Sequence, residues 1–101
     1  MGGKDPAYVR EDTDFDGAVQ NLVDGAFFNS GQSCCGIERI YVHETLFDNF
    51  VEAYVEQVKQ YSLANPLEPN TTLGPVVKTS AADWVRNQVA EAVSKDASAL
   101  S

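Results

Sequence analysis

The sequence predicts an α/β fold, with parallel-sheet βαβ units and about three helices. Two observations support it. Short runs rich in Tyr, Val and Ile alternate with longer segments whose apolar residues recur at the spacing of one helix face. The chain has 101 residues, of which 44% are hydrophobic and 22% charged, as is typical of one globular domain.

The first strand and helix are predicted within residues 6–27. The strand is expected at 6–12, PAYVRED, and the helix at Phe15–Phe27. Apolar side chains follow one face of this helix at Phe15, Ala18, Val19, Leu22, Val23, Ala26 and Phe27. The sequence DTD before it supplies N-cap candidates, and NSG at 29–31 supplies a helix stop.

A second strand and two further helices are predicted in the rest of the chain. The strand is GIERIYVH at 36–43, and Thr45 with Asp48 resembles a capping box that opens the second helix. The apolar stripe of that helix is Phe47, Phe50, Val51, Tyr54, Val55 and Val58. Residues 62–75 contain three prolines and are expected to form a long surface connection. The third helix begins near Ser80, with an apolar stripe at Ala81, Trp84, Val85, Val89, Ala92 and Val93. Trp84 is expected in the core or at an interface.

The charge and composition exclude several classes of partner. Seven basic and fifteen acidic residues give a net charge of −8, which argues against binding to nucleic acid or an anionic membrane. The sequence contains no apolar stretch long enough to span a bilayer and no signal-peptide pattern. Two adjacent cysteines without spaced partners indicate a reducing compartment, most simply the cytoplasm.

The two adjacent cysteines, Cys34 and Cys35, have two interpretations. A cysteine acts as a nucleophile through its thiolate, and Gly31 and Gly36 on either side suit a tight reactive loop. The preceding helix would present its negative end, which does not stabilise a thiolate. Alternatively, both residues are small buried hydrophobic side chains. The residue types alone leave both interpretations open.

Three segments resemble the aldehyde dehydrogenase superfamily. FFNSGQSCCGIER at 27–39 is similar to its active-site cysteine signature, an aromatic residue followed by Asn-x-Gly-Gln-x-Cys. A second signature of the family is Glu, then an aliphatic residue, then Gly-Gly-Lys. MGGKDP at the start is similar to its last four positions, with Met1 at the aliphatic position. YSLANPLEPNTTLGPVV at 61–77 resembles a later stretch of the family. The resemblance covers nearly all of the chain but only a slice of a family member. It implies that residues 1–101 are part of the catalytic domain, without the cofactor-binding domain.

The resemblance also implies roles for particular residues. Cys34 would be the nucleophile that attacks a small-molecule aldehyde, giving a thiohemiacetal and then a thioester. Phe28 and Asn29 would be walls of the substrate pocket, and Cys35 would lie near the site with its side chain turned towards the protein. Gly2 would lie near the nicotinamide of NAD or NADP. No metal is implied.

Parts of the catalytic machinery of that family lack a counterpart here. The catalytic glutamate would fall immediately before Met1, and the asparagine that helps to hold the oxyanion would lie further upstream. We therefore expect the chain alone to be inactive, and to form a homo-oligomer or pack against the remainder of a parent enzyme. Two alternatives stay open. One is an aldehyde dehydrogenase that passes its acyl group to coenzyme A, and the other is a non-enzymatic α/β module or assembly piece that retains a relic site.

Other candidate sites are less favoured. His43 could pair with a thiol as a catalytic dyad, but its place between a strand end and a helix cap is a simpler explanation. A metal site at Cys34, Cys35 and His43 lacks suitable spacing and a fourth ligand. GGK lacks the rest of a phosphate-binding loop, and Lys4 is expected to be structural. The remaining charged cluster, expected on a solvated helix face, is Glu52, Glu56 and Lys59.

Overall fold

A computed structural model describes residues 3–100, so Gly2 lies outside the described residues. The elements are β1 (Asp5–Val9), α1 (Phe15–Phe27), the 3-10 turn η1 (Phe28–Gly31), β2 (Ile37–Val42), α2 (Phe47–Val58) and α3 (Thr79–Ser94). The predicted order of strands and helices is therefore confirmed, with end points that differ by a few residues.

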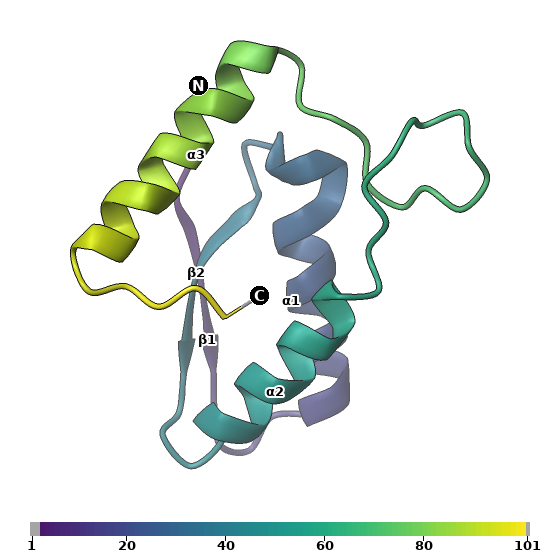
Figure 1. Cartoon of the computed structure of the whole chain (residues 1–101). Helices are drawn as coiled ribbons and strands as arrows, with labels where there is room; N and C mark the ends of the chain where they lie inside the picture. Colours follow the sequence, from purple (N-terminus) through teal and green to yellow (C-terminus); the bar gives the residue numbers. More distant parts are fainter. Residues whose placement is uncertain (1–2, 101) are drawn as a thin grey trace.

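The two strands form a parallel pair. Ala7 lies opposite Ile40, and Val9 lies opposite Val42. In the view of Figure 1, α1 and α2 lie to the right of the strands, whereas α3 lies to their upper left. Because the strands are parallel, both begin at the same end of the sheet. Gly3, which precedes β1, therefore lies close to Cys34, which precedes β2.

The core lies between the strand pair, α1 and α2. Its fully buried side chains are Val9 from β1, Val19 and Val23 from α1, and Phe50 from α2. The ring of Phe15 meets the ring of Phe50 edge-on, with their centroids 6.4 Å apart. Each such buried side chain contributes on the order of 1.5–3 kcal/mol to folding. The predicted stripe of α1 is thus the face that packs.

The predicted stop of the first helix is also confirmed. After α1 the backbone enters the left-handed region at three successive residues, Asn29 with φ 50°, Ser30 with φ 56° and Gly31 with φ 75°. Asn and Gly adopt this conformation readily, whereas Ser does so at a cost. The hydroxyl of Ser30 donates to the carbonyl of Gly74, which holds the strained residue in place.

The start of α2 differs from the prediction. The residue that caps α2 is Leu46, and no side chain makes a capping hydrogen bond there. The hydroxyl of Thr45 is engaged instead by Nδ1 of His43, at 2.8 Å. The predicted capping box is therefore wrong. Phe47, which was expected on the buried stripe, is 52% exposed because it lies in the first turn of α2, at the margin of the core.

Helix α3 buries none of its side chains, although its predicted stripe is present. Trp84 is 63% exposed, so it does not lie in the core, and its place at an interface stays a prediction. The physical reason is that two strands and two helices already enclose the small core. Within residues 3–100 nothing covers the α3 stripe. The connection before α3 lies on the surface as predicted, and one parallel bridge joins Leu63 to Leu73.

Candidate active site

The two cysteines occupy the centre of one tight turn between η1 and β2. The backbone N–H of Gly36 donates to the carbonyl of Ser33 at 3.1 Å, so Cys34 and Cys35 are the two central residues of a β-turn. The hydroxyl of Ser33 accepts a further bond from the N–H of Cys35 at 3.3 Å. Ser at the first position and Gly at the last match the preferences of the commonest turn type. The residues Ser-Cys-Cys-Gly therefore build this turn locally.

Both thiols of this turn are exposed and free. Burial as two small hydrophobic side chains is therefore excluded. The expectation that Cys35 turns towards the protein does not hold among the described residues, because Cys35 is exposed. Their sulfur atoms lie 3.6 Å apart.

The charge state of Cys35 depends on its neighbour. The contact with the Cys34 sulfur raises the pKa of the Cys35 thiol, and the negative charges of Cys34 and Asp5 raise it further. This arrangement therefore favours the protonated form of the Cys35 thiol. Asp5 belongs to β1, so the first strand also contributes to the electrostatics of the turn.

Among residues 3–100, no hydrogen-bond acceptor is found for the backbone N–H of Cys34. Within the turn, the N–H groups of Cys35 and Gly36 each donate a hydrogen bond, and the N–H of Cys34 donates none. A backbone N–H beside a nucleophilic sulfur is suited to hold the oxygen of a carbonyl group as that oxygen gains negative charge. Nucleophile and oxyanion donor would then come from the same residue.

A residue that the sequence did not single out contacts the turn. A Cβ atom placed on Gly3 would lie 2.4 Å from the carbonyl oxygen of Cys34, closer than any side chain can approach. The segment before β1 thus packs directly against the thiol turn. The sequence analysis assigned a role near the site to Gly2 and missed Gly3. The available signal was the pair of glycines immediately before a predicted strand.

The residues before the thiols form a small polar scaffold. The side-chain amide of Asn29 donates to the carbonyl of Gln32, and the amide of Gln32 donates to the carbonyl of Asn29, each at 3.1 Å. Oε1 of Gln32 also accepts from the N–H of Val77 at 2.9 Å. Asn29 and Gln32 therefore stiffen the approach to the turn and attach it to the connection before α3.

The proposed pocket walls do not meet the nucleophile. Phe28 and Asn29 line a hollow of about 500 Å³ against the end of α2 and Thr72. A larger apolar hollow of about 850 Å³ lies between the end of α1, the connection and the start of α3. Neither hollow includes Cys34. Among the described residues, then, the structure does not bring Phe28 or Asn29 into one pocket with the thiol.

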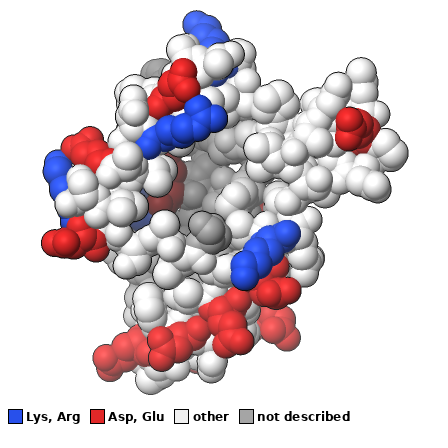
Figure 2. Space-filling model, viewed as in Figure 1, with Lys and Arg blue, Asp and Glu red and all other residues white. Residues whose placement is uncertain are grey.

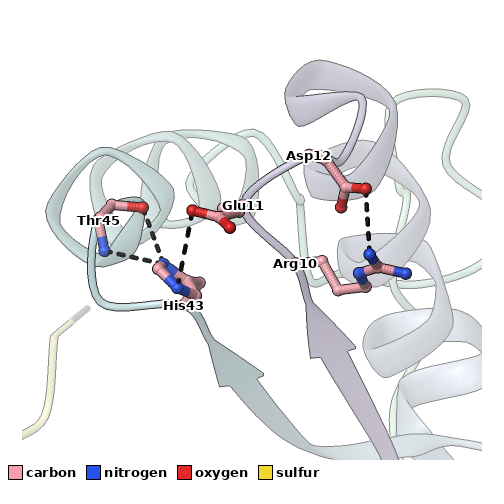
Figure 3. Close-up of polar contacts among 5 residues, drawn as sticks. All are labelled: Arg10, Glu11, Asp12, His43 and Thr45. Carbon is pink, nitrogen blue, oxygen red and sulfur yellow. Dashed lines mark hydrogen bonds and ion pairs between the residues drawn. The ribbon is translucent and has the colours of Figure 1, made fainter.

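His43 lies at the opposite end of β2 from the thiols. The six residues Ile37–Val42 separate it from the turn, a span of about 20 Å in a strand. Figure 3 shows its ring between Thr45 and Glu11, with Nε2 3.9 Å from the Glu11 carboxylate. A Cys–His dyad is therefore excluded. In the part of the chain that the structure describes, no three His, Cys, Asp or Glu side chains form a group that could hold a metal.

The charged residues outside the turn have structural or solvent-facing positions. Lys4 pairs with Glu38 and so connects the starts of the two strands, in line with the expected structural role. Acidic side chains gather at the lower end of the face in Figure 2, where α2 begins. The solvent exposure predicted for Glu52, Glu56 and Lys59 is confirmed. No helix within residues 3–100 is long and apolar enough to cross a bilayer.

The chain is similar to known proteins along its whole length. The model of the "aldehyde dehydrogenase family" matches residues 1–101. A succinate-semialdehyde dehydrogenase [NADP(+)] of Mycobacterium avium is 38% identical over 97 residues, which are 96% of this chain and 21% of that protein. Aldehyde dehydrogenase 1A1 of Homo sapiens is 44% identical over 77 residues, 76% of this chain and 15% of that protein.

A solved structure has the same fold over this region. It is a glyceraldehyde-3-phosphate dehydrogenase of Methanocaldococcus jannaschii in complex with NADP, with a TM-score of 0.91 and 35% identity. The match covers 94% of this chain and 21% of that one. The chain thus spans about a fifth of the length of these relatives, or less.

Proposed function

The chain belongs to the aldehyde dehydrogenase family, and on that premise we propose that Cys34 is the nucleophile of an aldehyde-oxidising enzyme dependent on NAD or NADP. The observation that supports the proposal most is the exposed Cys34 thiol in a tight turn, beside a backbone N–H that donates to no atom of residues 3–100. Residues 1–101 would form part of the catalytic domain, and the substrate would be a small-molecule aldehyde. Because both thiols are free, a reducing compartment such as the cytoplasm suits this role.

The chemistry begins at the sulfur of Cys34. Its thiolate attacks the carbonyl carbon of the aldehyde, a carbon–sulfur bond forms, and the electron pair of the carbonyl bond moves to oxygen. The N–H of Cys34 then donates to this oxygen, which stabilises the thiohemiacetal. Loss of a hydride from the same carbon leaves a thioester on Cys34. Hydrolysis of the thioester releases a carboxylic acid and restores the thiol.

The residues of this chain do not account for the whole reaction. NAD or NADP would accept the hydride, yet the sequence contains no glycine-rich fingerprint of a dinucleotide site, and Gly2 lies outside the described residues. We therefore assign to the described residues only the nucleophile and the oxyanion donor. Positioning of a reaction partner can contribute about 7–11 kcal/mol to catalysis. Purified residues 1–101 should accordingly show no NAD(P)+-dependent oxidation of aldehydes above that of a free thiol.

The role of Cys34 can be tested without a cofactor. An activated ester such as p-nitrophenyl acetate transfers its acetyl group to a reactive thiolate, and peptide mass mapping then identifies the acetylated residue. We expect acetylation of Cys34 in the parent chain and in Cys35→Ser, and its loss in Cys34→Ser. Both substitutions are at exposed positions, so the fold should tolerate them.

Two outcomes would contradict the assignment. If Cys35 is acetylated faster than Cys34, the nucleophile has been misplaced. If both thiols react equally and no faster than a cysteine in an unfolded peptide, a non-enzymatic α/β module with a relic site is the better interpretation. Acyl transfer to coenzyme A in place of water would use the same thiol, and nothing in residues 3–100 favours it.

A further inference from the structure

The smaller of the two hollows, about 500 Å³ in volume, lies where helices α1 and α2 end. Sites for small molecules have volumes of about 300–1,000 Å³. The residues that line this hollow at the two helix ends are Asp24, Phe27, Phe28, Gln57, Gln60 and Tyr61. We call it the helix-end hollow. Neither Cys34 nor Cys35 is part of its lining, so it is separate from the thiol turn.

Asp24 supplies the charge of the helix-end hollow. Among the lining residues that the structure describes, it is the only one with a charged side chain. The ion pairs within residues 3–100 do not include Asp24. Lys59, which follows α2, is exposed and does not line the hollow. The described residues therefore leave the Asp24 carboxylate without a paired cation.

The two helices add to this negative charge. The carbonyl end of an α-helix is equivalent to roughly half a negative charge, and its effect is strongest at the last turn. Asp24 and Phe27 belong to the last turn of α1, and Gln57 belongs to the last turn of α2. Neither helix has a basic residue in its last turn. Two helix ends and one carboxylate thus favour a positively charged ligand in the same hollow.

Aromatic rings form much of the rest of the wall. The rings of Phe27 and Tyr61 are tilted by 47° to each other, with their centroids 5.2 Å apart. Phe28 adds a third ring, which is 65% exposed. A cation near the face of an aromatic ring is attracted by the negative charge of that face. The side-chain oxygens of Gln57 and Gln60 can accept hydrogen bonds from the N–H groups of such a cation.

We propose that the helix-end hollow binds a small alkylammonium ion. The charged nitrogen lies beside Asp24 and the helix ends, and the hydrocarbon part packs on the rings of Phe27 and Phe28. A calcium or magnesium ion suits the lining less well, because such ions prefer several oxygen ligands and the hollow offers one carboxylate among three rings. The proposal does not depend on the role of Cys34, which lies outside this hollow.

Butylammonium chloride is a suitable probe for the folded 101-residue chain. In a titration at constant ionic strength, followed by proton–nitrogen correlation NMR, the amide signals of Phe28 and Gln60 should shift and reach saturation. The dissociation constant should be on the order of 1 mM. Butanol, which has the same hydrocarbon chain without the charge, should bind about tenfold more weakly.

Two substitutions and one control test the assigned contacts. Asp24→Asn should weaken butylammonium binding about three- to tenfold, because it removes the carboxylate at an exposed position where the fold should tolerate the change. Phe28→Leu retains an apolar side chain without an aromatic face and should weaken binding about threefold. Asp48→Asn removes the same charge from the opposite end of α2 and should leave the affinity unchanged.

Three results would overturn the proposal. The first is equal binding of butanol and butylammonium, since the hollow would then select only for hydrocarbon. The second is an equal loss of affinity in Asp24→Asn and Asp48→Asn, since the cation would then respond only to the net charge of −8. The third is the absence of a saturable shift up to about 50 mM butylammonium. The acetylation test of Cys34 has a separate readout, so either proposal can fail without the other.

Discussion

Helices α1 and α3 carry similar apolar stripes, but only α1 packs its stripe against the rest of the chain. Val19 and Val23 of α1 are fully buried between the strands and α2. Val85, Val89 and Val93 of α3 are each about half exposed. The difference shows that an apolar period identifies the face of a helix that is able to pack. It does not show that another element of the chain packs against that face.

Chain connectivity explains the different outcomes. A short turn joins α1 to β1, so the helix folds back onto the strand that precedes it. Helix α3 follows residues 59–78, which form a surface connection attached through Ser30 and Gln32. The region before residue 59 supplies every fully buried hydrophobic side chain of the described core. The region after it supplies exposed apolar surface.

The largest effect should come from the aromatic centre of the core. Phe50→Ala should lower the free energy of unfolding by about 3–5 kcal/mol, because it removes a buried ring and leaves a cavity. Phe47→Ala, one turn earlier on α2 and 52% exposed, is the matched control and should cost well under half as much. Urea denaturation of both variants measures the difference. Equal losses would mean that α2 packs differently from the arrangement described above.

The comparison of the two helices can be tested with one type of substitution. Val23→Ala on α1 should lower the free energy of unfolding by about 1–3 kcal/mol. In the monomeric chain, Val89→Ala on α3 should change it by no more than about 0.5 kcal/mol, since it removes no buried contact within one chain. The two urea midpoints give the answer directly. If the substitution on α3 is as costly as that on α1, the stripe of α3 is covered in solution.

The exposed stripe of α3 leads us to propose that the chain self-associates or packs against the remainder of a longer protein. Open strand edges and contiguous apolar surface both favour association. Val89→Glu should weaken self-association about tenfold, or about 1.4 kcal/mol, in light scattering at micromolar concentration. Gln88→Glu adds the same charge beside the stripe and is the control. A parent chain that is already a monodisperse monomer with cooperative unfolding would refute the proposal.

The smallest effect is expected at the polar attachment between the two regions. Gln32→Ala removes the acceptor for the N–H of Val77 and should cost about 0.5–1.5 kcal/mol. Hydrogen exchange at the Val77 amide should become faster, while exchange in α1 should stay unchanged. Gln88→Ala, on the exposed side of α3, should alter neither. Unchanged exchange at Val77 in Gln32→Ala would show that the attachment is not formed in solution.

Local chemistry determined much of this protein from the sequence alone. The order of strands and helices, the helix stop at Asn29–Gly31 and the choice of Cys34 as the candidate nucleophile all come from short stretches of residues. The apolar period of a helix, the residues that adopt a left-handed turn and the seven-residue cysteine motif each involve residues close together in the sequence. The turn that holds the thiols belongs to the same class, because Ser33 and Gly36 alone indicate it.

Only the tertiary structure decided which faces find partners. Phe47 and Phe50 belong to one predicted stripe, yet the position of α1 buries only the second fully. Trp84 is exposed, although it belongs to a predicted apolar stripe. Gly3 lies against the carbonyl of Cys34 because the two parallel strands begin at the same end of the sheet. These outcomes depend on residues far apart in the chain, because a side chain is buried only when a second surface packs against the one that carries it. The local sequence pattern identifies the apolar face of a helix, and the fold determines whether a partner surface covers that face.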